Sequence, residues 1–429
     1  MTDSDHERDA KPGERRAGLR LPRDGRIDST AALLAAPYDY VRETCARFGS
    51  DLFEARLLLR RTTCMRGPEA AALFYDESRF KRHGATPEPV RATLLGKGGV
   101  QGLDDRTHQN RKAMFMSLMD TQRIAELAEL VEREWLLDAE AWSMKREVGL
   151  YDVLHPMLMR SVCSWADVPL PAKDIGRRTR DIVPLFDRAA ALGVGHLRAR
   201  IGRLRSERWL ASVIKDVRGG RLAPPPETAL AVIAAHRDAA GRLLTPRIAA
   251  VELLNVLRPT VAVSVYIVFV AHALHSFPAV SPRGKGDEFA DQFVQEVRRF
   301  YPFFPAVMAK ARRNFSWKGM RFPKGRRVLL DLHATNRSSA WQDPDVFRPD
   351  RFEGDDGAPF KLIPQGGGDH YRHHRCPGEW ITLALMKVAV RILTERIRYE
   401  LPDQDLRIDR KRLPALPMSR FIIKNVAMS

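Results

Sequence analysis

The sequence predicts a mainly α-helical protein with a few small β-sheets, built as one large domain. Long segments carry apolar residues at three- and four-residue spacing, which is the period of an amphipathic helix. Strand-like segments are short and gather between residues 309 and 331. The 429 residues are 44% hydrophobic and 29% charged, and no internal repeat or low-complexity block divides them. These proportions are those of an ordinary globular chain with a large core.

The first half of the chain predicts a tail followed by helices. Residues 1–25 hold too little apolar material to offset the entropy of ordering, so we expect a mobile tail there and the domain over 26–429. Thr121 to Trp142 predicts a long helix. Residues 180–214 predict another helix, dense in arginine. Its basic face is either simply solvated, which we favour, or an entrance that attracts anions.

The second half predicts helices, then short strands, then a final helix. A buried helix is centred near Arg258, since its length exceeds that of a strand. In order, the expected elements are a loop at 219–226, helices within 227–277 and at 287–300, strands at 309–315 and 327–331 with a turn at 322–325, a loop-rich stretch at 338–369, and a helix from about 378 to 396.

The charge and the cysteines of the chain indicate which binding partners and which cellular compartment to expect. The formal net charge is +18, from 71 Lys and Arg against 53 Asp and Glu, which favours anionic partners or substrates. The four cysteines lie far apart without zinc spacing, so a disulfide scaffold and a zinc ribbon are not expected. The N-terminus lacks the apolar segment of a secretion signal, and the apolar run from Val261 to Leu274 is short for a membrane span. We therefore expect a cytoplasmic protein.

Cys376 is the first residue that suggests chemistry. It lies in PQGGGDHYRHHRCPGEW, after a Gly-rich loop and directly before the final helix. Positive charge from Arg375 and the helix start would stabilise a thiolate, and the glycines let backbone approach a flat ligand. Taken alone, such a cysteine is a nucleophile, a metal ligand or, most commonly, an inert core thiol.

Two further motifs precede this loop in the chain. Glu296 and Arg299 form E-x-x-R on a predicted helix, and P-D-R-F supplies Arg351. In this order, E-x-x-R, P-D-R-F and the Gly-rich cysteine loop resemble the cytochrome P-450 family, from about Asp39 to the end. The resemblance implies that fold, with Glu296, Arg299 and Arg351 as a buried structural triad.

The resemblance also implies a cofactor, haem b, between the central helix and the cysteine loop. Cys376 would be the axial thiolate ligand of the iron. His108 and Lys112, in THQNRKAMF, match the position that holds the haem propionates. Arg375 and Gly378 flank the ligand and complete the expected haem-binding set.

The sequence departs from the usual family pattern in two places. The cysteine loop lacks the F-x-x-G-x-R-x-C spacing, and the central helix lacks the acid–alcohol pair. Its segment reads LLNVLRPTVAV, with Glu252 as the nearest acid. A buried Arg258 needs an anionic partner, either a carboxylate of the chain or, as we favour, a substrate carboxylate held by a bidentate fork. Pro259 removes a backbone N–H and frees the Asn255 carbonyl, which should bend the helix.

Four segments are similar to the fatty-acid peroxygenase branch of the family: the R-P pair, PQGGGD, RRFYPFFP and GKGGVQGLDDRTHQNRKAMF. This similarity implies hydroxylation of fatty acids at the alpha or beta carbon by hydrogen peroxide. Arg258 would hold the substrate carboxylate, which acts as general acid–base beside Pro259. Gln101 would face the haem and favours hydroxy acids over the alternative, decarboxylation to terminal alkenes. Leu95 and Val261 are expected in the substrate pocket, while Phe303 and Phe304 line it or pack the core with equal weight.

Other functions remain open at this point. A reductase-dependent monooxygenase is disfavoured by the missing acid–alcohol pair, and a haem sensor without enzymatic activity would use the same charge. Zinc-finger, RNP and basic-zipper motifs are absent from the sequence, so a nucleic-acid partner is not expected. The expected partners are a fatty acid and hydrogen peroxide, with no obligate reductase and no membrane span. The oligomeric state and preferred chain length are not predicted.

Overall fold

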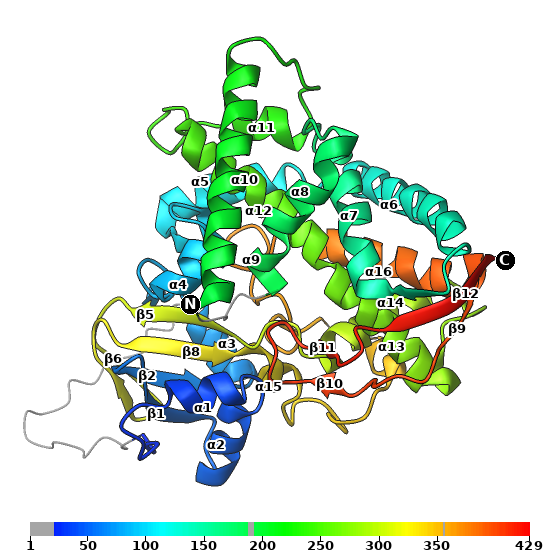
Figure 1. Ribbon diagram of the computed structural model, residues 1–429. Coiled ribbons are helices and arrows are strands. Elements are labelled where there is room, and N and C mark those ends of the chain that lie inside the picture. Colours follow the sequence, from blue (N-terminus) through cyan, green and yellow to red (C-terminus); the bar gives the residue numbers. More distant parts are fainter. Residues whose placement is uncertain (1–20, 188–192, 355–356) are drawn as a thin grey trace, which may run out of the picture.

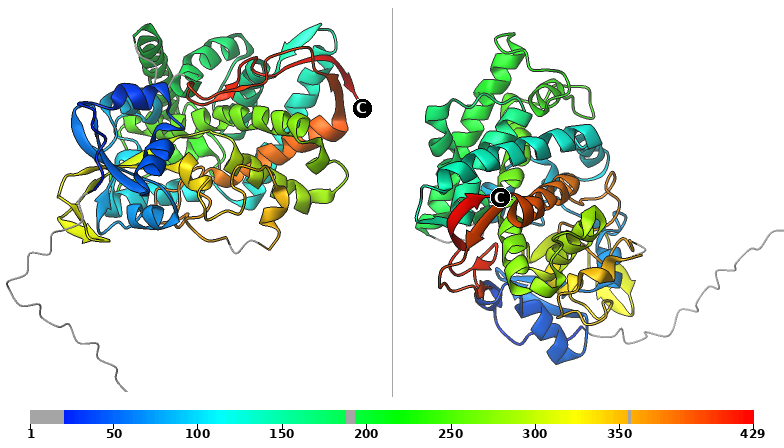
Figure 2. Two further views of the ribbon diagram at one scale, coloured as in Figure 1. Left: turned by 90° about the horizontal axis from the view of Figure 1, so that it is seen from below. Right: turned by 90° about the vertical axis from the view of Figure 1, so that its right-hand side faces the viewer.

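The computed structural model describes residues 21–187, 193–354 and 357–429. It confirms the predicted fold class, since helices fill most of the molecule and the sheets are small. Figure 1 shows the helical part above and to the right of a β-rich part, in which blue N-terminal strands lie beside yellow strands from later in the chain. The C-terminus and the N-terminal hairpin lie at opposite ends of the molecule (Figures 1 and 2).

The helices carry the labels of Figure 1. The α-helices of the described residues are α1 (Thr30–Ala35), α2 (Tyr40–Phe48), α3 (Pro68–Phe74), α4 (Glu88–Val90), α5 (Asp105–Met116), α6 (Thr121–Trp142), α7 (Leu150–Trp165), α8 (Ala172–Ile182), α9 (Pro184–Asp187), α10 (Val194–Arg218), α11 (Ala229–Ala235), α12 (Pro246–Ala262), α13 (Ser264–Ser276), α14 (Gly286–Phe300), α15 (Leu332–Asn336) and α16 (Glu379–Arg391). Short π- and 3₁₀-helices are η1 (Arg91–Leu95), η2 (Val100–Gly102), η3 (Pro278–Val280), η4 (Pro349–Phe352) and η5 (Ile392–Arg396).

The main sheet joins an N-terminal segment, residues 52–81, to a segment much later in the chain, residues 306–331. It has five strands in the order β1-β2-β8-β5-β3, from β1 (Leu52–Leu57), β2 (Arg60–Met65), β8 (Arg327–Asp331), β5 (Ala306–Ala311) and β3 (Phe80–Lys81). β2 pairs with β8 in parallel, with Thr62 opposite Arg327. The smaller sheets contain β4 (Glu147–Gly149), β12 (Ile422–Met428) and β9 (Ile397–Glu400); β10 (Ile408–Asp409) and β11 (Leu416–Pro417); and β6 (Phe315–Trp317) and β7 (Met320–Phe322).

Most of the predicted elements occur, but the predicted bounds of one helix and one strand were wrong. α6 has the predicted bounds. The single helix expected over 180–214 is divided, because Pro184 lacks the N–H that would continue α8 and Gly193 precedes α10 with a φ of +61°. The strand expected at 309–315 lies at Ala306–Ala311, where it pairs with β8. The chain leaves that sheet after Ala311 and starts β6 at Phe315.

The expected tail falls largely outside the described residues, which begin at Leu21. The backbone N–H of Asp24 donates to the carbonyl of Glu54, and the N–H of Glu54 donates to the carbonyl of Pro22, at 2.9 and 2.8 Å. Residues 21–25 therefore belong to the folded part, next to β1, rather than to the tail.

The centre of the helical part is the pair α12–α13. Together they span Pro246–Ser276, a stretch long and apolar enough to cross a membrane, but 94% of its most apolar window is buried inside the protein. α12 packs against α7, α10 and α11, and α13 packs against α7, α14 and α16. α12 continues through Pro259 to Ala262, so the bend expected from the missing N–H stays a prediction, and Val263 separates α12 from α13. This interruption lies beside the candidate site.

Candidate active site

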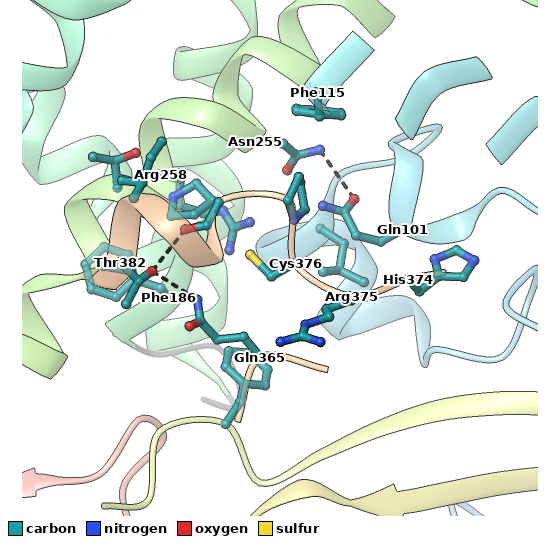
Figure 3. A pocket seen from close by; sticks show the side chains of 18 of the residues that line it. Gln101, Phe115, Phe186, Asn255, Arg258, Gln365, His374, Arg375, Cys376 and Thr382 are labelled. Atoms are coloured by element: carbon teal, nitrogen blue, oxygen red, sulfur yellow. Dashed lines mark hydrogen bonds between the residues drawn. The ribbon is translucent and has the colours of Figure 1, made fainter. Parts of the chain in front are cut away.

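A cavity lies between α12 and the loop that carries Cys376 (Figure 3). One wall is formed by Asn255, Val256, Arg258 and Pro259 of α12, and the opposite wall by the segment from His374 to Gly378. Further lining residues come from many elements: Leu94, Leu95, Val100, Gln101, His108, Lys112, Phe115, Met119, Phe186, Tyr266, Phe303, Phe304, Val307, Leu332, Ile381 and Thr382. Most of these side chains are apolar, so the few polar groups stand out.

The Gly-rich loop presents Cys376 to this cavity. The N–H of Cys376 donates to the carbonyl of Gln365 at 3.0 Å, which folds the two ends of the loop together. Gly366 makes the fold possible, because its φ is +97° and a Cβ there would lie 3.0 Å from the Tyr75 hydroxyl and 3.2 Å from the Arg375 Cα. Figure 3 shows the sulfur pointing into the space that the Arg258 side chain also enters.

The electrostatic surroundings of Cys376 are mixed. Burial raises the pKa of the thiol, whereas Lys112 and the backbone N–H of Gly378 act in the opposite direction. The helix α16 begins at Glu379, directly after Gly378. The positive groups named from the sequence therefore do not outweigh burial, and a cation bound at the sulfur would be needed to hold the thiolate at neutral pH.

Arg375 does not point freely into the cavity. Its Nε donates to Glu379 Oε2 at 2.6 Å and its Nη2 to Oε1 at 3.1 Å. Arg298 and His370 bind the same carboxylate, and although burial alone would raise the pKa of Glu379, Arg298, His370 and Arg375 hold it well below its ordinary value. Glu379 and Arg298 were not predicted from the sequence, although the spacing of four between Arg375 and Glu379 is typical of an ion pair.

His108 and Lys112 lie one turn apart on α5, at the edge of the cavity. His108 is buried and stacks on His374 with ring centroids 3.8 Å apart, and its Nδ1 has no hydrogen-bond partner among the described residues. Burial lowers the pKa of His108 to about 4 and that of Lys112 to about 8. The ammonium of Lys112 donates to the carbonyl of Arg375. These are donors that an anionic group at this edge would engage.

Arg258 is the unusual charge of the site. It is 7% exposed, its Nε is buried without a hydrogen-bond partner, and no carboxylate within the described ranges forms an ion pair with it. Burial lowers the pKa of its guanidinium to about 9, with a smaller contribution in the same direction from Arg203. The group is therefore charged at neutral pH but unpaired, which costs free energy unless an anion binds.

The acid nearest to Arg258 in sequence belongs to a different network. Glu252 is fully buried and accepts from Arg111 Nη1 at 2.5 Å and from Asn255 Nδ2 at 3.0 Å. The same Asn255 Nδ2 lies 3.4 Å from Gln101 Oε1, so the network ends on the cavity side with Gln101. Asn255 and Arg111 were missed from sequence, although Asn255 precedes Arg258 by three residues and so shares its helix face.

The expected pocket residues separate into two groups. Leu95, Phe303 and Phe304 all line the cavity, and both phenylalanines also pack against the hydrophobic core. Val261 was wrongly assigned to the pocket. It is 0% exposed, lies in the hydrophobic core and is not among the residues that line the cavity, although it follows Arg258 by one helical turn; it points away from Pro259, from which it is turned by about 200°.

The structure brings Glu296, Arg299 and Arg351 together away from the cavity. Arg299 donates twice to Glu296, at 2.6 Å from Nε and 2.7 Å from Nη2, and Arg351 Nε lies 3.3 Å from Glu296 Oε2. Arg299 Nη1 also donates to the carbonyl of Pro344 at 2.8 Å. This cluster fixes α14 against the loop-rich segment that precedes the cysteine loop.

Comparisons with known proteins agree with this architecture. The family model for cytochrome P-450 matches residues 288–424. Among curated proteins, the chain is 32% identical over 145 residues to taxane 10-beta-hydroxylase of Taxus cuspidata and 31% identical over 121 residues to melianol synthase of Melia azedarach. These alignments cover 33% and 27% of the chain and only 28% and 23% of those relatives.

Solved structures match over nearly the whole chain. Cytochrome P450SP alpha (CYP152B1), in complex with (R)-ibuprophen, is 51% identical with a TM-score of 0.92, over 94% of this chain and 99% of that one. Cytochrome P450EX alpha (CYP152N1), with myristic acid, is 41% identical with a TM-score of 0.93, over 96% and 100%. A variant of cytochrome P-450 OleT, in complex with arachidonic acid, is 34% identical with a TM-score of 0.92, over 95% and 99%.

Proposed function

The chain belongs to the cytochrome P-450 family, and we propose that it is a peroxygenase that hydroxylates long- and medium-chain fatty acids at the alpha or beta carbon. In this reaction a C–H bond and hydrogen peroxide give a C–OH bond and water. Two structural relatives were crystallised with fatty acids, myristic and arachidonic acid, which supports the substrate class.

The residues around the cavity fit the haem that the family implies. The Cys376 thiol faces an apolar space, and at its edge the unpartnered Nδ1 of His108 and the ammonium of Lys112 are suited to carboxylates. We propose haem b, because its two propionates would accept hydrogen bonds from His108 and Lys112 at this edge and Cys376 would supply a thiolate ligand to the iron. When bound, the haem supplies an iron centre at which hydrogen peroxide is activated for oxidation of a C–H bond.

The observation that carries the proposal is the unpaired, buried guanidinium of Arg258. A fatty acid brings the missing anion, and its carboxylate can accept a bidentate pair of hydrogen bonds from the planar fork. The apolar lining residues Leu95, Val256 and Phe186 then suit an alkyl chain. Both halves of the substrate thus have a complement in one cavity.

Arg258 also gives the substrate a part in proton transfer. Among the described residues that line the cavity, Glu and Asp are absent, so the chain offers no carboxylate next to the reacting atoms. The bound substrate carboxylate therefore moves the proton between the two oxygens of hydrogen peroxide, as general acid–base. Because Arg258 fixes the head group, the carbons that reach the reaction centre are those closest to it, which explains alpha and beta selectivity.

Gln101 favours hydroxylation as the outcome. Its amide lines the cavity and has no titratable proton, and Asn255 holds its oxygen from the side of α12. A neutral amide neither donates a proton to an intermediate nor carries a charge near the head group. We propose further that the enzyme acts in the cytoplasm without an obligate reductase, since hydrogen peroxide already carries the oxygen atom and the two electrons that a reductase would otherwise deliver to dioxygen.

The decisive experiment uses haem-loaded protein, tetradecanoic acid and hydrogen peroxide, without reductase or NADPH. We expect 2- and 3-hydroxytetradecanoic acid by gas chromatography–mass spectrometry. Arg258→Ala should lose this turnover by about 100-fold while keeping the haem, because a charge-assisted bidentate contact is removed. Arg407→Ala, at an exposed arginine far along the chain, is the matched control.

Three results would contradict the proposal: no hydroxy acid from the unmodified protein, wild-type turnover by Arg258→Ala, or equal losses in both variants. Predominant formation of the alkene one carbon shorter would move the assignment to decarboxylation. Cys376→Ser tests the ligand separately, because it should abolish the thiolate-type absorption band of the ferrous–carbonyl form.

A further inference from the structure

The outer face of α10 exposes a row of apolar side chains. Val194, Leu197, Ile201 and Leu204 are 68%, 57%, 39% and 52% exposed. Their spacing of three, four and three residues places them on one side of the helix, along about three turns. Single exposed leucines are common on protein surfaces, but a continuous row marks a surface that meets an apolar partner. We call these four residues the α10 stripe.

Arginines border the α10 stripe on both sides. Arg198, Arg200, Arg205 and Arg208 are exposed on the same helix, and the neighbouring α8 adds Lys173, Arg177 and Arg180. Acidic neighbours neutralise part of this border: Arg177 lies 2.9 Å from Asp174, Arg205 lies 3.6 Å from Asp181 and Arg200 lies 3.9 Å from Glu88. These seven residues are the basic rim of the stripe. The surface therefore combines apolar contact with strong attraction for anions.

The opposite face of α10 holds the wall of the cavity. Arg203 is buried there and its Nη1 donates to the carbonyls of Thr93 and Leu94, at 3.0 and 3.1 Å. Those residues belong to η1, whose Leu94 and Leu95 line the cavity, and α10 also packs on α9, which contributes Phe186. Figure 1 shows α10 as the long green helix beside α8 and α9. One helix thus separates the cavity wall from the stripe.

We propose that the α10 stripe and its basic rim dock the protein on the surface of an anionic lipid bilayer. Apolar side chains between arginines match the boundary of such a bilayer, where leucines enter the acyl region and guanidinium groups meet phosphate. The chain's net charge of +18 attracts the protein to the same surface. A second copy of the chain fits less well, because two arginine rims would repel each other.

Binding of the α10 stripe to a bilayer does not require that the enzyme oxidises fatty acids. Its advantage, a higher concentration of substrate near the cavity, rests on the proposed function. Fatty acids partition into bilayers with the carboxylate at the head-group level. A protein held there by α10 has its cavity wall one helix away from the lipid, so its substrate is concentrated next to it.

The test measures binding of the full-length, haem-loaded protein to vesicles by flotation. Vesicles of phosphatidylcholine alone are compared with vesicles that also contain phosphatidylglycerol. We expect at least about tenfold stronger binding to the anionic vesicles, weakened by added salt, since each basic group adds attraction that is screened. Leu197→Ser/Leu204→Ser should reduce this binding about tenfold or more, since two apolar side chains leave the bilayer.

Matched variants distinguish binding through the α10 stripe from nonspecific binding through exposed leucines or arginines elsewhere on the surface. Leu58→Ser/Leu59→Ser removes two leucines that are 51% and 75% exposed at the turn between β1 and β2, and should change binding by less than about twofold. Arg198→Gln/Arg205→Gln should lower the preference for anionic vesicles, whereas Arg242→Gln/Arg407→Gln, with exposed arginines elsewhere, should leave it largely intact. Haem absorption and thermal unfolding confirm that each variant is folded.

Several outcomes would overturn docking: no flotation with anionic vesicles, equal loss in the stripe and control variants, or unchanged binding of the stripe variant. If size-exclusion chromatography with light scattering shows a dimer that Leu197→Ser/Leu204→Ser converts to monomer, the stripe's partner is a second copy instead. Turnover of dispersed tetradecanoic acid distinguishes the two proposals. Leu197→Ser/Leu204→Ser should retain this turnover. If the unmodified protein binds vesicles but does not turn over tetradecanoic acid, the proposed function is refuted and docking is not.

Discussion

Glu252 and Arg258 lie six residues apart on α12, and they differ in that the charge of Glu252 is paired whereas that of Arg258 is not. Both are buried, at 0% and 7% exposure. The carboxylate of Glu252 is bonded to Arg111 and Asn255, whereas the guanidinium of Arg258 has no ion pair among the described carboxylates and a buried, unpartnered Nε. The Glu252 pair stabilises the fold, whereas the unpaired guanidinium next to the cavity is the group that we propose binds a substrate carboxylate.

Asp331 shows a third way to bury a charge. It is 1% exposed, its Oδ1 accepts from the N–H of Ala334, and its Oδ2 has no partner among the described residues. Burial raises the pKa of this carboxyl to about 7, so a proton can neutralise it. Arginine has no such option at neutral pH, because its guanidinium keeps its proton. In the proposed function, the partner of Arg258 is the carboxylate of the fatty acid.

The largest expected effect follows from breaking the completed pair. Glu252→Ala leaves Arg111 buried and unpaired, and should lower the free energy of unfolding by about 3–5 kcal/mol. Urea denaturation of the apo and haem-loaded protein measures it. The double variant Glu252→Leu/Arg111→Met should recover most of the loss. A single variant within about 0.5 kcal/mol of the unmodified protein would show that the pair is not structural.

Arg258→Met should behave in the opposite way. Replacing an unpaired buried charge by an apolar side chain of similar length should leave the free energy of unfolding unchanged or raise it by about 1 kcal/mol. Binding of tetradecanoic acid, followed by the spectral shift of the haem, should weaken by roughly 100-fold, or about 2–3 kcal/mol. A loss of stability as large as that of Glu252→Ala would mean that Arg258 is structurally paired.

Asp331 makes a smaller contribution that depends on pH. Its folded pKa of about 7 lies above the unfolded value of 3.8, so its contribution to stability is complete below pH 3.8 and is lost as the pH rises through 7. Relative to Asp331→Asn, the unmodified protein should lose about 1 kcal/mol of stability per pH unit across this window. Denaturation at several pH values measures the difference, and parallel curves for the two proteins would contradict the assignment.

The smallest effect should come from the end of the Glu252 network. Gln101→Leu keeps the size of the side chain and removes the 3.4 Å contact with Asn255, so stability should change by about 0.5 kcal/mol or less. The ratio of 2-hydroxy to 3-hydroxy product should shift, since Gln101 lines the cavity, while affinity for the acid stays within about twofold. An unchanged product ratio would reduce Gln101 to a lining residue.

Local signals in the sequence were sufficient for most of the helices and for the main chemical groups, although the helix predicted over 180–214 is divided. The periodicity of Thr121–Trp142 specified α6 to the residue, because a hydrophobic face repeats within the helix itself. Cys376, Arg258 and His108 were recognised from short motifs, and the structure places all three on one cavity. A charge in an apolar segment is visible in one dimension, so the need of Arg258 for an anion was already evident.

The partners of those groups were decided by the tertiary structure. Arg111 and Glu252 are 141 residues apart and Arg298 and Glu379 are 81 apart, so no spacing rule connects them. Val261 was misassigned because the packing of other helices on α12 decides which of its sides faces the cavity. The sequence by itself thus determined which residues carry charge, thiol or apolar surface. Which of them stay unpaired depends on contacts between distant segments, and that decides where a ligand binds.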